Sequence, residues 1–140
     1  MVANPAGFQP VYGDRYDAIT GVARETISGG EFVYSSGAAG AVGSVVATFN
    51  PQVDLLFATG ASGNLVTGIA MNNAGSNEPL SVARRGSFLV PCEEDIVAGN
   101  AVDVATVNAV RLTDNAAARI GRALTGAASG GFILLDLNTA

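Results

Sequence analysis

The residue types that most often carry acid–base and metal chemistry are scarce in this sequence. It contains no histidine and one cysteine, which excludes Ser-His-Asp triads, histidine-ligated metals, zinc sites built from several cysteines and disulfides within the chain. The cysteine, Cys92, stands beside three carboxylates, Glu93, Glu94 and Asp95. Neighbouring negative charges raise a thiol pKa, so we interpret Cys92 as a small, half-buried hydrophobe at a strand end.

The acidic run Glu93–Asp95 is the best arrangement of carboxylates for acid–base or cation chemistry. Adjacent residues of an extended chain point to opposite sides, so these three side chains do not converge unaided. We interpret the run as a solvated turn, with a calcium ion at a subunit contact as the alternative. The sequence therefore predicts no enzyme, no cofactor and no metal within one chain.

Two glycine-rich stretches, 37–43 and 60–63, have the composition of phosphate-binding loops. A dinucleotide loop lies between a strand and a helix, and a Walker loop needs a lysine. Both stretches are flanked by strand-like sequence, and the chain has no lysine. We interpret them as turns or a loop.

The charge balance argues against nucleic acid as a partner. Seven basic residues, all arginine, stand against twelve acidic ones, and the formal net charge is −5. Phosphate recognition needs clustered cations, whereas the adjacent basic residues here are Arg84 and Arg85. One of these two arginines should face outward. The pair is either an ordinary pair of surface residues or part of an interface with acidic groups of a partner protein.

Residues 1–20 predict an extended N-terminal arm, because Pro5 and Pro10 disfavour a regular helix. The arm contains three aromatic residues at intervals of four: Phe8, Tyr12 and Tyr16. Exposed aromatic rings gain from burial, so we expect them to pack either on the parent domain or on another subunit. We select Phe8, Pro10, Tyr12 and Tyr16 as a candidate binding segment.

From residue 21 onward the pattern is typical of a β protein. The chain of 140 residues fits one domain. Short runs rich in Val, Ile and Phe are bounded by Gly, Asn, Ser or Asp, and several alternate with period two, as at Val102/Val104 and Val110/Leu112. A helix is least excluded at 115–118. We find no apolar run of about 18 residues and no secretion signal at the N-terminus, so we expect no membrane span and no conventional secretion.

An imperfect internal repeat organises residues 21–140. Gly30 matches Gly99, and Gly68 matches Gly121. The copies cover about 22–90 and 91–137, and the first contains an insertion within about 35–60. We expect the two copies to close on each other, which predicts an all-β fold: a single small β-barrel or sandwich with an extended N-terminal arm.

The order of the apolar segments resembles that of small capsid decoration, or head-stabilising, proteins of tailed bacterial and archaeal viruses. The resemblance extends over roughly residues 22 to 137. It is carried by Ile27–Tyr34, Val66–Ala70, Leu80–Pro91, Ile96–Val102, Ile120–Leu124 and Phe132–Leu137. These motifs mark the strands and turns of a β-barrel and contain no catalytic residues. The long first-copy insertion and the arm depart from the family pattern.

The resemblance implies a structural virion protein and no enzyme. Such a protein forms a homotrimer on the outer surface of an icosahedral head and binds the major capsid protein, after passing through the host cytoplasm during assembly. One alternative is a tail, connector or fibre-base component of a virion. Another is a ligand- or carbohydrate-binding β-barrel, which the absence of tryptophan disfavours. We expect no nucleic-acid or membrane partner.

Overall fold

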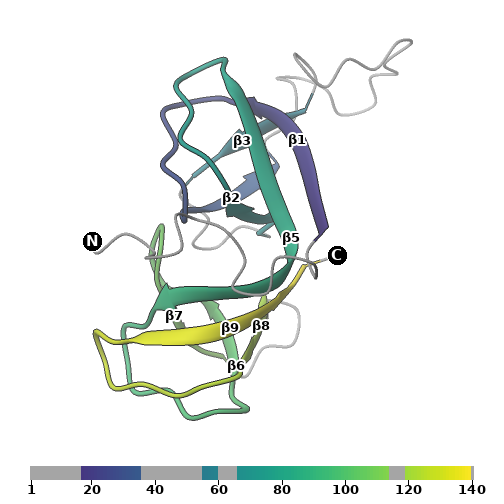
Figure 1. Cartoon of the computed structure of the whole chain (residues 1–140). Coiled ribbons are helices and arrows are strands. Elements are labelled where there is room, and N and C mark those ends of the chain that lie inside the picture. The colour runs from purple at the N-terminus through teal and green to yellow at the C-terminus, as the bar shows by residue number, and fades with distance from the viewer. Residues whose placement is uncertain (1–16, 36–54, 60–65, 114–118, 140) are drawn as a thin grey trace.

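A computed structural model describes residues 17–35, 55–59, 66–113 and 119–139 of the chain (Figure 1). These residues form strands and no helix, so none of them lies in a helix that could span a membrane. The predicted all-β class is confirmed. The strands are β1 (Asp17–Ala23), β2 (Phe32–Ser35), β3 (Leu56–Ala58), β4 (Gly68–Ala70), β5 (Pro79–Pro91), β6 (Ala101–Val104), β7 (Val110–Leu112), β8 (Gly121–Ala123) and β9 (Phe132–Asn138).

The strands are arranged as two small rings that share β5 (Figure 1). In the first ring the order is β1-β3-β2-β4-β5, and β1 pairs again with β5, which closes it. In the second the order is β5-β9-β8-β6-β7, and a parallel bridge from Cys92 to Val110 brings β7 back to the end of β5. We call these the first barrel and the second barrel. Each closes on itself, rather than on the other as the repeat had suggested.

Backbone hydrogen bonds recur at equivalent positions of the two barrels. The Gly30 amide donates to the Ala70 carbonyl at 2.8 Å, and the Gly99 amide donates to the Ala123 carbonyl at 2.7 Å. Both glycines have positive φ, of 90° and 94°, which few other residues adopt. The pairing places 17–35 in correspondence with 86–104, and 55–83 with 108–136. The extra residues of the first copy therefore fall at 36–54, where the second copy has 105–107.

Strand β5 joins the barrels. It follows the first barrel, bends, and continues along the second (Figure 1). Gly86 lies inside it with a φ of 138°, a conformation that favours glycine. The apolar runs 80–83 and 87–90 are separated in the sequence by Arg84, Arg85 and Gly86. Both runs and these three residues belong to one strand.

The start of β1 differs from the prediction. The sequence predicts residues 17–20 as part of an extended arm, but they pair with β5 from the Asp17–Arg85 register onward. Residues 17–20 therefore belong to the first barrel, and the predicted arm keeps residues 1–16 as its candidate range. Residues 1–16 lie outside the described part of the structure, as do the apolar run at 42–49 and residues 115–118, where a helix is least excluded by the sequence.

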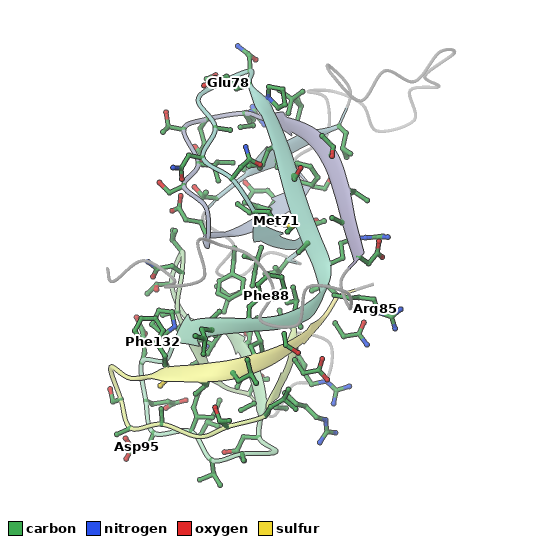
Figure 2. All side chains as sticks on the ribbon, viewed as in Figure 1. Met71, Glu78, Arg85, Phe88, Asp95 and Phe132 are labelled. Carbon is green, nitrogen blue, oxygen red and sulfur yellow. The ribbon has the colours of Figure 1, made fainter. Side chains whose placement is uncertain are left out.

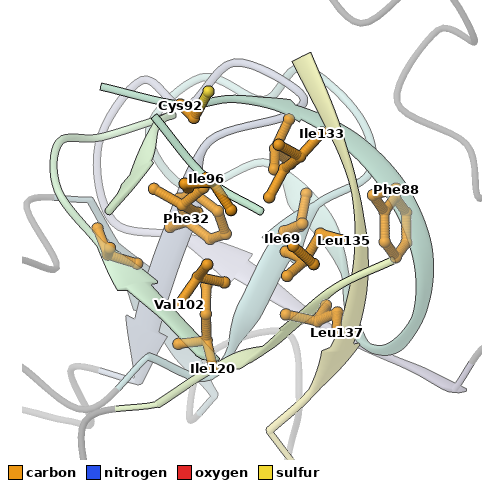
Figure 3. Packing of buried hydrophobic residues seen from close by; sticks show 14 of the residues in the cluster. Phe32, Ile69, Phe88, Cys92, Ile96, Val102, Ile120, Ile133, Leu135 and Leu137 are labelled. Carbon is orange, nitrogen blue, oxygen red and sulfur yellow. The ribbon is translucent and has the colours of Figure 1, made fainter. Parts of the chain in front are cut away.

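Alternating apolar side chains fill the two barrels. The smaller core cluster includes Val33, Phe57 and Leu80 of the first barrel. The larger includes Leu135 of the second barrel, and it also takes in Phe32, Ile69 and Ala83 from the first (Figure 3). Because side chains of both barrels share this cluster, the barrels pack together rather than acting as separate beads on β5.

Candidate interaction surfaces

The start of β1 is held against β5 where that strand passes from one barrel to the other. A carboxylate oxygen of Asp17 lies 2.8 Å from a guanidinium nitrogen of Arg84. The register of β1 against β5 shifts between Asp17 and Ala18, and such an irregularity bends a strand locally. The candidate binding residues Phe8, Pro10, Tyr12 and Tyr16 lie outside the described residues. The structure thus places Asp17, the residue that follows the predicted arm.

The two adjacent arginines have different surroundings. Arg84 is half-buried, and its Nε is buried without a hydrogen-bond partner in the described part of the chain. The Arg84 carbonyl accepts a hydrogen bond from the Thr139 amide at 3.0 Å, which ties the C-terminal strand to the same place. Arg85 is exposed and points away from the barrels (Figure 2). Arg84 therefore has a structural role, and Arg85 is available to a partner.

The acidic run contributes to turns of the second barrel. A Glu94 carboxylate oxygen accepts the Leu112 amide at 2.6 Å, and one of Asp95 accepts the Ser129 amide at 2.9 Å. The Glu93 carbonyl accepts a hydrogen bond from the Ser129 hydroxyl at 2.7 Å. No group of three metal-ligating side chains occurs within the described ranges. The Glu94 and Asp95 carboxylates thus accept from separate backbone amides, and the Glu93 backbone carbonyl accepts from a hydroxyl.

The role of Glu94 is repeated in the first barrel by Glu25. Its carboxylate accepts the Thr59 amide at 2.9 Å and the Thr59 hydroxyl. These bonds hold the pKa of Glu25 below its ordinary value, with the hydroxyl contributing most. The repeat that matches Gly30 with Gly99 also pairs Glu25 with Glu94, and this pairing is the signal in the sequence for their shared role.

Cys92 is buried rather than half-buried, at 2% exposure. Its thiol lies 3.3 Å from the Ala128 carbonyl oxygen and 3.4 Å from that of Gly131. Burial raises the pKa of this thiol, outweighing the hydrogen bonds around it. Cys92 is therefore a packing residue of the second barrel.

Sequence reasoning missed a set of outward-facing apolar residues on the second barrel. Leu124 is 48% exposed, and its amide donates to the carbonyl of Leu134 at 2.7 Å. Leu134 is the register partner of Leu89 on β5. The sequence of a single strand does not show which of its leucines face the core. The residues at equivalent positions of the other repeat copy are the signal that distinguishes core leucines from outward-facing ones.

Comparison with known proteins supports the fold. No protein-family model matches the chain, and the comparison with curated proteins found no match. Among solved structures, the chain is similar to the head fiber gp8.5 N base of bacteriophage phi29, with a TM-score of 0.60 and 13% sequence identity. The match covers 89% of this chain and 96% of that one. At this identity the likeness shows a shared architecture across nearly the whole of both chains.

Proposed function

We propose that this chain is a structural virion protein without enzymatic activity, which decorates the outside of an icosahedral head. In this proposal it acts as a homotrimer, binds the major capsid protein and stabilises contacts between neighbouring capsid subunits. The protein would join the head during assembly in the host cytoplasm. The proposal requires neither a cofactor nor nucleic acid or a membrane as a partner.

The observation that carries this proposal is the likeness of fold to the base of a bacteriophage head fiber. The resemblance of the sequence motifs within residues 22 to 137 to those of capsid decoration proteins points to the same class of protein. The charge agrees, because a chain with a net charge of −5 is poorly suited to bind packaged DNA.

The arm and Arg85 are the proposed shell contacts. Three copies of one chain, each with a weak contact, bind a symmetric surface far more tightly than one copy does. Phe8, Tyr12 and Tyr16 provide aromatic area for such a contact. Arg85 lies exposed near the place where the arm leaves the barrel, so an acidic group beside the arm's binding site would meet it.

The proposal is tested by adding purified protein to heads that lack it and measuring the temperature at which the heads release DNA. Binding should raise that temperature, and a variant lacking residues 1–16 should not. A deletion to residue 20 is unsuitable because it removes more than half of β1. No rise in the release temperature with the full chain at saturating concentration would refute the proposal.

A fibre-base role is the second candidate, because the similar structure is itself the base of a head fiber. The two roles differ in what the bound protein does. A decoration protein strengthens the shell by itself, whereas a fibre base presents a further fibre. Heads that bind the protein without any gain in heat stability would favour the fibre base.

A further inference from the structure

The two barrels of one chain provide an internal comparison of their outer faces. Thr20 of the first barrel corresponds to Leu89 of the second, and Ser81 corresponds to Leu134. In the first barrel this cross-strand pair is polar, with its hydroxyl oxygens 3.4 Å apart. In the second barrel the same pair consists of two leucines. The same backbone therefore carries a polar face on one barrel and an apolar face on the other.

The strand alternation shows that these leucines face outward. Their chain neighbours Phe88, Val90, Ile133 and Leu135 fill the core. Leu89 and Leu134 are half-buried and belong to neither core cluster of the described residues. The pair Pro91 and Phe132 forms the adjoining row, at the end of β5 and β9 far from Arg85 (Figure 2).

Exposed apolar side chains are concentrated on the second barrel. The large apolar side chains of the described residues that are clearly exposed are Val97, Leu112 and Leu124, at 68%, 41% and 48%. All three belong to the second barrel, where the first has Ser28, Thr59 and Met71. Apolar patches that stay exposed mark interaction sites.

The polar border of the leucine face carries both signs of charge. Arg122 of β8 and Asp136 of β9 are register partners next to the leucine row, and both are exposed. Within the described ranges they form no ion pair with each other; the Arg122 guanidinium donates instead to the Gly99 carbonyl at 3.5 Å. A face that presents an acid and a base side by side is complementary to a second copy of itself. This matters because two chains of net charge −5 repel each other elsewhere.

We propose that the outer face of Leu89, Leu134 and Leu124 is the contact between copies of this chain. The leucines of adjoining copies pack against one another, and Arg122 of one copy meets Asp136 of the next. This inference rests on the self-association in the proposed function and adds the face that performs it. The first barrel, with Thr20 and Ser81 at the equivalent positions, stays outside the contact.

The test exchanges the leucines for the residues that the first barrel carries. Light scattering coupled to size-exclusion chromatography should give the full chain three times its 14.0 kDa mass. The double variant Leu89→Thr/Leu134→Ser should elute as a monomer, because losing the exposed parts of both leucines from the contact raises the dissociation constant about 10-fold or more. Its circular dichroism and cooperative unfolding should match wild type, since the same residues fit the same backbone in the first barrel. The matched control Thr20→Ala/Ser81→Ala should keep the wild-type mass.

The charged border gives a second measurement with a rescue. Asp136→Arg alone and Arg122→Asp alone should each weaken the oligomer, and the two together should restore it. A folded Leu89→Thr/Leu134→Ser variant with the wild-type mass would overturn the inference, as would a monomeric full chain. A variant that keeps its mass but no longer binds heads would assign the face to the shell instead. An oligomer that these substitutions dissociate, but that never binds heads, supports the face and refutes decoration.

Discussion

Replacing Gly121 by alanine is predicted to destabilise the protein far more than the same replacement at Gly130, another glycine of the second barrel. A Cβ atom at Gly121 would lie 2.1 Å from the Asp136 carbonyl oxygen and 3.0 Å from its carbon. Ordinary contacts start near 3.4 Å, so β8 and β9 would have to separate by more than an ångström. The obstacle is backbone, which cannot rotate aside as a side chain can.

The cost has two parts. Overpacking of a tight site costs about 1–3 kcal/mol. The separation also strains hydrogen bonds beside the site, such as those from Asn138 to Ile120 at 2.9 Å and from Leu124 to Leu134 at 2.7 Å, each worth about 1 kcal/mol. We expect Gly121→Ala to lower the free energy of unfolding by about 4 kcal/mol, and the melting temperature by about 10 °C or more.

Gly130→Ala is the matched control. Gly130 has a φ of 87°, and a Cβ there would meet no atom within 4 Å. It therefore incurs backbone strain alone, about 1 kcal/mol. Urea unfolding of the two variants, followed by circular dichroism, measures both. A Gly121→Ala protein within about 1 kcal/mol of wild type would refute the assigned β8–β9 pairing.

Three further predictions concern the acid response, the thiol and the arm. Because the pKa of Glu25 is lowered in the folded state, its carboxylate stabilises the fold above the unfolded pKa, and this contribution is lost as pH falls through the folded pKa. Glu25→Gln should therefore lose less stability than wild type between pH 7 and pH 3 in urea titrations. An equal loss would contradict the role of Glu25 as an acceptor for Thr59. Buried Cys92 should react with a thiol reagent only when urea unfolds the protein; rapid labelling of the folded chain would show that the second barrel opens. Removing residues 1–16 should abolish head binding in a sedimentation assay while leaving the oligomer mass and melting temperature unchanged, and retained binding would exclude the arm as an anchor.

The sequence predicted the class of the fold because its signals are local. Period-two alternation at Val102 and Val104 corresponds to two buried side chains of β6. The same pattern failed at Leu112, which is 41% exposed. The Glu94 carboxylate accepts the Leu112 amide at the end of the strand. Residue periodicity does not predict such a contact, because the two residues are far apart in the sequence.

The arrangement of the strands was harder to predict. The closing of each copy on itself depends on the parallel pairing of β1 with β3 and on the course of β5 through Gly86. Polar residues followed by glycine look alike in a turn and in a bend within a strand. The leucine face was missed for another reason: Leu89 and Leu134 differ from core leucines only by the side of the strand they occupy.

The most direct test of the central claim uses one sample of the full chain. Its mass is measured by light scattering, and the same material is then sedimented with heads that lack it. We expect an oligomer of three chains that pellets with the heads. A monomer that stays in the supernatant would contradict both the decoration function and the contact through the leucine face, and would leave the two-barrel fold as the remaining result.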